Sequence, residues 1–194
     1  MQNVSIKDFD ILSQAEKDEA VSLLNRYEQI DKQAECHDDF LKFVKYMWGD
    51  TFIMGRHHKI IAEKFNRIAT GKLKRLIVCL PPRHSKSEFA STYLPAWMMG
   101  LNGALKIIQC THTAELAVRF GRKVRNLIDS DDYKQIFPNL KLQADNKSAG
   151  RWTTNQEGES FYAGVGGAIT GRGADLLIID DPHSEQDALS PKSL

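Results

Sequence analysis

A lysine and a serine, Lys86 and Ser87, stand between a short polar loop and a helical stretch. The loop, residues 81–87, reads PPRHSKS and is entered through the apolar run 73–80 (LKRLIVCL). When a strand is followed by a tight loop and then by the first turn of a helix, backbone N–H groups and the positive end of the helix point at an anion. Lysine supplies a cation for phosphate and serine a hydroxyl for Mg²⁺, so the segment predicts a phosphate site.

The loop departs from the P-loop pattern G-x-x-x-x-G-K-[ST], in which two glycines precede the lysine. Leu80 and Ser85 occupy those two glycine positions here. Ser85 must therefore adopt whatever backbone angles the loop demands, whereas glycine does so without steric cost. A proline-rich turn with a solvated lysine stays open as an alternative for this segment taken alone.

Two adjacent carboxylates, Asp180 and Asp181, follow the apolar run 176–179 (LLII). An ATPase with such a loop needs a carboxylate at the end of a second buried strand to hold Mg²⁺. Asp180 is predicted to bind the metal through its water shell, and Asp181 to orient or deprotonate the attacking water. A strand-ending turn at Pro182 is the alternative, but the two motifs in this order favour a nucleotide site.

The elements that must position these residues follow from the spacing of apolar side chains. Helices are predicted over 14–35, 37–48, about 57–70, from Glu88 with a late interruption at Pro95, and about 113–128. Strands are predicted over 73–80, 105–110 and 176–179, with short strands or a hairpin within the polar segment 133–160. The alternation of strand and helix indicates a parallel α/β sheet behind a helical leader.

Composition excludes several classes of protein. The 194 residues, 42% hydrophobic and 26% charged, are typical of a globular domain, and no run approaches the ~18 apolar residues of a membrane span. Three widely spaced cysteines without a CxxC pair read as reduced thiols rather than a disulfide or zinc scaffold. The net charge of +1 conceals an asymmetry, because residues 1–40 carry 4 basic and 10 acidic side chains and the remainder is moderately basic.

The motifs resemble those of the large terminase subunit of tailed bacteriophages, the motor ATPase that packages viral DNA. The resemblance covers roughly residues 40–190 and is carried by PPRHSKSEFASTYLPAW (81–97) and GAITGRGADLLIIDDP (167–182), with support from 56–65 and 111–128. It implies an α/β P-loop NTPase fold of the ASCE/RecA-like type, a parallel sheet flanked by helices. The helical leader would span residues 1–70 and the ATPase core residues 71–194, incomplete at its C-terminus.

The resemblance also implies roles for single residues. ATP would contact the loop residues Pro82, Arg83, His84, Ser85, Lys86 and Ser87, with Mg²⁺ bound by Ser87 and Asp180. Arg83 would contact the γ-phosphate in cis, and Asp181 falls where many members carry the catalytic Glu. Arg172 resembles an arginine finger presented to a neighbouring subunit, with a loop arginine that binds solvent or DNA as the alternative. His57 and His58 lie near an adenine-contacting motif, with a helix cap or a surface position as the alternative.

Partners are implied by the family more than by the residues. They are double-stranded DNA, the small terminase subunit, the portal or procapsid, and further copies of the chain in a ring, within the cytoplasm of the bacterial host. The helix around 117–128 offers Arg119, Arg122, Lys123 and Arg125, which could follow DNA phosphates or form an ordinary solvated face.

The family's coupling motif and nuclease domain do not follow Asp181 before Leu194. We therefore expect an N-terminal fragment that hydrolyses ATP weakly and has no nuclease activity. The competing functions are a helicase-like P-loop ATPase and a non-catalytic assembly module that docks a partner through its acidic leader.

Overall fold

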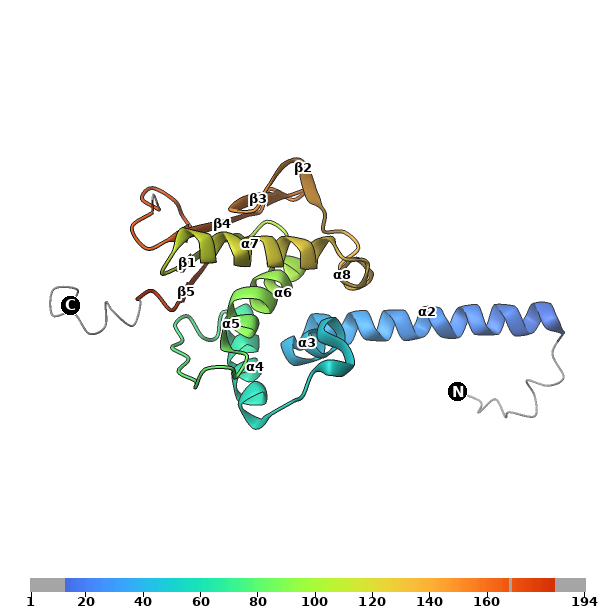
Figure 1. Cartoon of the computed structure of the whole chain (residues 1–194). Coiled ribbons are helices and arrows are strands. Elements are labelled where there is room, and N and C mark those ends of the chain that lie inside the picture. Colours follow the sequence, from blue (N-terminus) through green and yellow to red (C-terminus); the bar gives the residue numbers. More distant parts are fainter. Residues whose placement is uncertain (1–12, 168, 184–194) are drawn as a thin grey trace.

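The computed structural model describes residues 13–167 and 169–183 (Figure 1). Residues 1–12 of the predicted leader, Ala168 of the second motif and residues 184–194 lie outside these ranges. The helical elements are α2 (Gln14–Asp38), α3 (Phe40–Trp48), η1 (Gly49–Thr51), α4 (Arg56–Ala69), α5 (Lys86–Glu88), η2 (Phe89–Tyr93), α6 (Leu94–Leu101), α7 (Ala114–Asp129) and α8 (Asp131–Ile136). The strands are β1 (Lys106–Thr111), β2 (Leu142–Ser148), β3 (Arg151–Thr154), β4 (Glu159–Gly164) and β5 (Leu176–Asp180).

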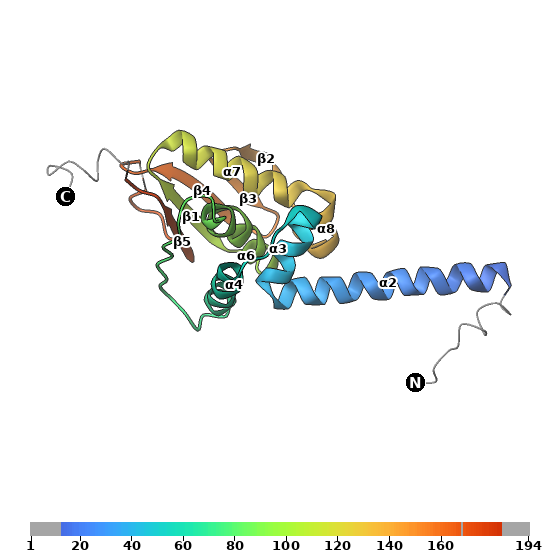
Figure 2. The same ribbon diagram turned by 60° about the horizontal axis from the view of Figure 1, so that its bottom comes forward.

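Helices α2, α3 and α4 form where helices are predicted within residues 14–70, and α2 projects from the body of the molecule (Figures 1 and 2). Ser13 and Glu16 start α2 with a reciprocal capping box, which satisfies backbone donors at the helix end. The C-terminal end of α2 packs on the body, where Trp97 Nε1 donates to the Cys36 carbonyl at 2.7 Å. Farther along the helix Leu24 and Tyr27 are exposed, so α2 is anchored at one end only.

An α/β fold is confirmed, but the sheet is mixed and open. Its strand order is β2-β3-β4-β1-β5, with β1 parallel to both β4 and β5. The prediction of a parallel sheet is wrong for β2 and β3, which pair antiparallel with each other, and β3 also pairs antiparallel with β4. Tight turns that need few residues connect these strands, so the polar segment 133–160 forms the predicted hairpin rather than a βα crossover.

The two faces of the sheet differ in what covers them. The inner face, which carries Ile107, Tyr162, Leu176 and Ile178, packs against the aromatic and aliphatic side chains of α6, η2 and α7. The outer face carries Leu177 and Ile179, which are 55% and 59% exposed. Alternating burial along β5 follows from the period of two in a strand, so that one face of β5 is held in the core and the other is not.

The strand predicted over 73–80 does not form. These residues lie between α4 and α5 without strand structure, and Ile77 is 90% exposed. Within the described ranges no strand pairs with them, and β5 is an end strand of the sheet. An apolar run reports a tendency to be buried, but a strand also needs a hydrogen-bonding neighbour. The prediction failed because the sequence does not reveal whether that neighbour exists.

The helix predicted from Glu88 is continuous through Pro95 rather than interrupted by it. Helical structure extends from Lys86 to Leu101, with a π-helical turn at Phe89–Tyr93 immediately before the proline. Proline lacks the N–H of the regular i→i−4 bond and its ring crowds the carbonyl four residues back. A wider π-turn relieves that crowding, and such turns are frequent at functional sites.

The core of the body is aromatic. Phe40 packs edge-on against Phe65, Phe89 and Trp97 with ring centroids 5.2–5.6 Å apart, an arrangement favoured by the ring quadrupoles. Trp97 and Trp152 are buried, as expected for packing residues. The three cysteines are free thiols. Among residues 13–167 and 169–183 no helix combines the length and apolar character needed to cross a membrane.

Candidate functional site

The two sequence motifs meet at the carboxyl end of β5. Lys86 begins the helical run that follows the loop, and its Nζ lies 2.5 Å from Asp181 Oδ1 and 3.6 Å from Asp180 Oδ1. In the register of the sheet Asp180 pairs with Thr111, the last residue of β1. The carboxyl ends of adjacent parallel strands are where open α/β sheets bind ligands. The predicted trio of Lys86, Asp180 and Asp181 is therefore brought together across 95 residues of chain.

Charge at this point is unbalanced. One ammonium group faces two carboxylates, of which the Asp180 side chain is 7% exposed and the Asp181 side chain 67%. Burial acts to lower the pKa of Lys86, but the hydrogen bond to Asp181 and the charges of Asp180 and Asp181 outweigh it and raise that pKa above its ordinary value. Lys86 is therefore held as a cation, and the trio keeps a net negative charge that a divalent cation would reverse.

Asp180 has a second partner that sequence analysis missed. Ser91 Oγ donates to Asp180 Oδ2 at 2.9 Å, and both residues are buried. Ser91 lies in the π-helical turn η2, four residues after Ser87, so helical spacing places the two serines on nearly the same side. That spacing was the signal in the sequence, although the π-turn changes the register and only the structure shows which serine bonds Asp180.

The backbone around the site is strained. Arg83, Ser85 and Asp181 have positive φ values of 62°, 62° and 44°, which side chains other than glycine adopt at a cost of about 1–3 kcal/mol each. Ser85, at the position of a glycine in the P-loop pattern, adopts the left-handed conformation, with φ 62° and ψ 14°. Residues held in such conformations cluster at functional sites.

The remaining loop residues lie on the surface beside the trio. Pro82, Arg83 and His84 are exposed, and His84 Nδ1 donates to the Pro82 carbonyl at 2.8 Å. Ser87 follows Lys86 directly and is partly buried in the first turn of the helical run. These positions leave the loop open to solvent on the side where a ligand of Lys86 would lie.

His57 and His58 connect the start of α4 to the loop. His58 is buried and its Nδ1 accepts from the Gly55 N–H at 2.9 Å, so it caps the helix. Its Nε2 lies 3.0 Å from His57 Nε2, and the His57 ring stands 5.5 Å from that of His84. Burial, followed by the charges of His57 and His84, lowers the pKa of His58. His58 therefore forms the helix cap that was the alternative to an adenine contact, while His57 faces the loop.

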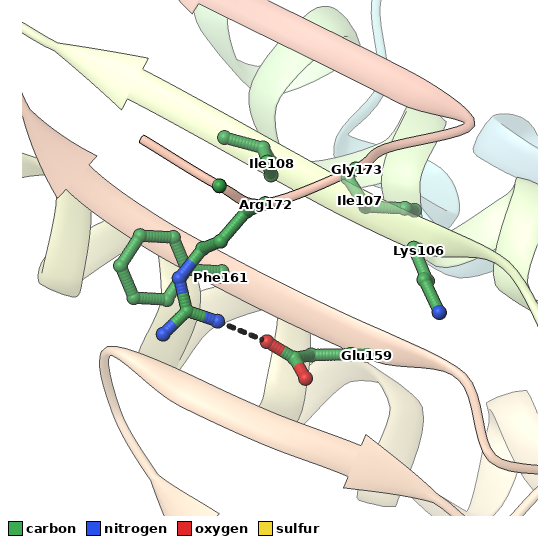
Figure 3. Close-up of a pocket in the computed structure, with 8 residues that line it drawn as sticks. Lys106, Ile107, Ile108, Glu159, Phe161, Arg172 and Gly173 are labelled. Atoms are coloured by element: carbon green, nitrogen blue, oxygen red, sulfur yellow. Dashed lines mark hydrogen bonds and ion pairs between the residues drawn. The ribbon is translucent and has the colours of Figure 1, made fainter. Parts of the chain in front are cut away.

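Arg172 is not part of this constellation. It lines a separate cavity of about 200 Å³ with Lys106, Glu159 and Phe161, on the outer face near the amino ends of β1 and β4 (Figure 3). Its Nη1 donates to Glu159 Oε1 at 2.8 Å, and its guanidinium lies 4.0 Å from the centre of the Phe161 ring. Figure 3 shows the side chain lying across that ring. The predicted finger is thus paired within its own chain.

The basic helix of the sequence analysis is α7. Its apolar side, with Phe120 and Val124, packs toward the sheet, and Arg119 and Arg122 are exposed. Lys123 pairs with Glu88, the residue next to Ser87. Two arginines therefore face solvent on this helix, while the lysine ties α7 to the start of the loop's helix.

The oxygen donors of the site suit a hard cation. Within the part of the chain that the structure describes, no three His, Cys, Asp or Glu side chains form a metal-binding group by themselves. Mg²⁺ is usually bound through one or two carboxylates together with phosphate oxygens and waters. Asp180, together with Ser87 in the first turn after the loop, offers that partial set, so the residues fit Mg²⁺ that arrives with a nucleotide.

Comparisons with known proteins give the chain no family. No family model, curated protein or solved structure matches it. Any functional conclusion therefore depends on the geometry of Lys86, Asp180, Asp181 and Ser91 and on the motifs themselves.

Proposed function

We propose that this chain is an ATPase motor domain of the DNA-packaging type, with a P-loop NTPase fold, that binds Mg²⁺–ATP and hydrolyses its γ-phosphate. The observation that carries the proposal is the meeting of Lys86 with Asp180 and Asp181 at the carboxyl end of β5. P-loop NTPases place a lysine from a loop–helix junction on the nucleotide phosphates and hold Mg²⁺ with a carboxylate at the end of a strand, and the Lys86–Asp180 arrangement is similar. The strained loop and the partly exposed Lys86 add support.

The chain's residues would act as follows. The Lys86 ammonium exchanges its contact with Asp181 for a phosphate oxygen of the nucleotide, since phosphate carries more negative charge. Asp181, released from that pair and largely exposed, then accepts a hydrogen bond from the attacking water. Arg83, in the exposed loop, stabilises charge that develops on the γ-phosphate. Mg²⁺, held by Ser87 and Asp180, supplies electrostatic stabilisation of the phosphate oxygens.

A nucleotide titration tests this proposal. The parent chain is expected to bind a fluorescent ATP analogue in Mg²⁺, and Lys86→Ala is expected to weaken binding by about tenfold or more, the loss of a charged hydrogen bond. Lys123→Ala is the matched control, because it removes a lysine that pairs with Glu88 of the same helical run. Absence of binding by the parent chain would reject the ATPase and favour the assembly module.

Translocation of double-stranded DNA is the part of the proposal that depends most on the resemblance. The exposed Arg119 and Arg122 of α7 support it, because a basic helix can follow phosphates without reading sequence. We expect duplex DNA to stimulate ATP hydrolysis by the parent chain. The double variant Arg119→Gln/Arg122→Gln is expected to show a smaller stimulation. Strand unwinding would instead indicate a helicase-like ATPase. Arg172 reaching a neighbour's nucleotide in a ring of copies likewise stays a proposal.

A further inference from the structure

The buried carboxylate Asp180 has its two oxygens in different surroundings. Oδ2 accepts a hydrogen bond from Ser91 Oγ at 2.9 Å, on the side of the core. Oδ1 lies 3.6 Å from Lys86 Nζ, on the side of the loop. The residue is 7% exposed, so water cannot replace either partner freely.

Ser91 owes its place to the helix that carries it. It lies in the π-helical turn η2 and is fully buried, between the loop's first helical residues and Pro95. Pro95 crowds the Ser91 carbonyl, four residues before it, in a regular helix. The π-turn thus accommodates the proline and sets the direction in which Ser91 meets β5.

From this geometry we infer that Ser91 is a positioning residue for metal binding at the proposed nucleotide site. By occupying Oδ2 it fixes the plane of the Asp180 carboxylate and leaves Oδ1 alone to face the loop, as a single oxygen ligand. Groups that hold a ligating carboxylate in this way contribute roughly 10–100-fold to metal affinity. The inference rests on the proposed function, because the metal is the Mg²⁺ of the nucleotide.

The neighbouring residue provides a matched control. Thr92 lies in the same π-turn and is 5% exposed, and its hydroxyl has no hydrogen-bond partner in the described part of the chain. Thr92→Val therefore removes a buried hydroxyl from the same turn without touching Asp180. Ser91→Thr keeps the hydroxyl at position 91, whereas Ser91→Ala removes it.

The experiment compares the affinity for a fluorescent ATP analogue in Mg²⁺ with the affinity in EDTA for the parent chain and the three variants. The ratio of the two affinities reports the metal's contribution without requiring hydrolysis. Ser91→Ala is expected to lower that ratio by about tenfold while the affinity in EDTA changes less than about twofold. Ser91→Thr and Thr92→Val are expected to keep the ratio of the parent chain.

The outcomes separate the inference from the proposed function. An unchanged ratio in Ser91→Ala, or equal losses of affinity in Mg²⁺ and in EDTA, would overturn the positioning role and leave nucleotide binding intact. A parent chain that binds nucleotide without any effect of Mg²⁺ would also overturn it. A parent chain that binds no nucleotide would overturn the proposed function, and the inference with it. Thermal unfolding of each variant identifies any that fail to fold. Should Ser91→Ala fail, Ser91→Cys, which keeps the size of the side chain but offers only a weak donor, takes its place with the same expected loss.

Discussion

The two faces of the sheet carry charge in different ways. On the inner face Asp180 is buried, receives one hydrogen bond from Ser91 and lies beside a single lysine. On the outer face Glu159 accepts from both Arg151, at 3.1 Å, and Arg172, at 2.8 Å. The inner cluster has an excess of negative charge and the outer one an excess of positive charge.

Charge alone would place an anion site on the outer face, with its two arginines. Burial and strain argue for the inner one. A charge removed from water must have fixed partners, so its geometry is determined by the fold. Asp180, 7% exposed, is removed from water more completely than Glu159, whose side chain is 25% exposed. A carboxylate held by the core beside a strained loop is therefore better evidence for chemistry than a larger number of surface cations.

Neutralising one carboxylate on each face should affect ATP hydrolysis very differently. Asp180→Asn is expected to lower Mg²⁺-dependent ATP hydrolysis by about 100-fold or more, since metal stabilisation of the transition state supplies several kcal/mol. Glu159→Gln removes a carboxylate that lies on the outer face and should leave turnover within about twofold. Steady-state phosphate release measures both. A large loss in Glu159→Gln would show that the outer face takes part in the chemistry.

The two faces also differ in how deeply their apolar side chains are buried, and substitutions at adjacent residues of β5 test this difference. Ile178 is 8% exposed in the core and Ile179 is 59% exposed. Ile178→Ala is expected to lower the free energy of unfolding by about 2–5 kcal/mol, and Ile179→Ala by under about 1 kcal/mol. Urea unfolding followed by circular dichroism gives both values. Similar losses in the two variants would mean that the outer face is covered in solution.

Much of the fold follows from the sequence, because apolar spacing and end signals determine long elements locally. The helix predicted over 113–128 is α7, Ala114–Asp129, and the strand predicted over 176–179 is β5, Leu176–Asp180. The wrong predictions concern features that depend on residues far away in the sequence. The run 73–80 has apolar strand character but no pairing partner among the described strands, and nothing in its own residues reveals that.

In the candidate site, too, some contacts follow from the sequence and others depend on the three-dimensional arrangement. The two motifs predict one site, and Lys86 does meet Asp180 and Asp181. The loop does not reach this edge of the sheet through a strand, however, because residues 73–80 form none. The bond from Ser91 could not be predicted, because it depends on a π-turn that no local pattern announces. The pairing of Arg172 with Glu159 depends on how the loop after β4 returns across the outer face, which the sequence does not specify.

Relieving the backbone strain at the inner site is expected to have a smaller effect on stability. Ser85→Gly is expected to raise the free energy of unfolding by about 0.5–1 kcal/mol, because glycine adopts a φ of 62° without steric cost. Glu157 is the matched control, since it has a φ of 65° in the turn between β3 and β4. Glu157→Gly should stabilise by a similar amount. A gain at Glu157 with a loss at Ser85 would mean that the Ser85 side chain makes a compensating contact.

The smallest expected effect is a difference between the two faces in how the stability contributed by their ion pairs depends on pH. The pKa of Lys86 is raised in the folded chain, so its ion pair stabilises the fold fully below the unfolded lysine pKa of about 10.4 and loses that contribution as pH rises through the folded value. Arginine side chains in general keep their charge over the same range. The difference in unfolding free energy between the parent chain and Lys86→Met, under about 1 kcal/mol at pH 8, should therefore shrink toward pH 11. The difference between the parent chain and Arg172→Met should stay constant, because this pair contains no lysine. If both differences fell in parallel, the loss would come from general expansion of the chain at high pH, and the inner lysine would have no special coupling to its carboxylates.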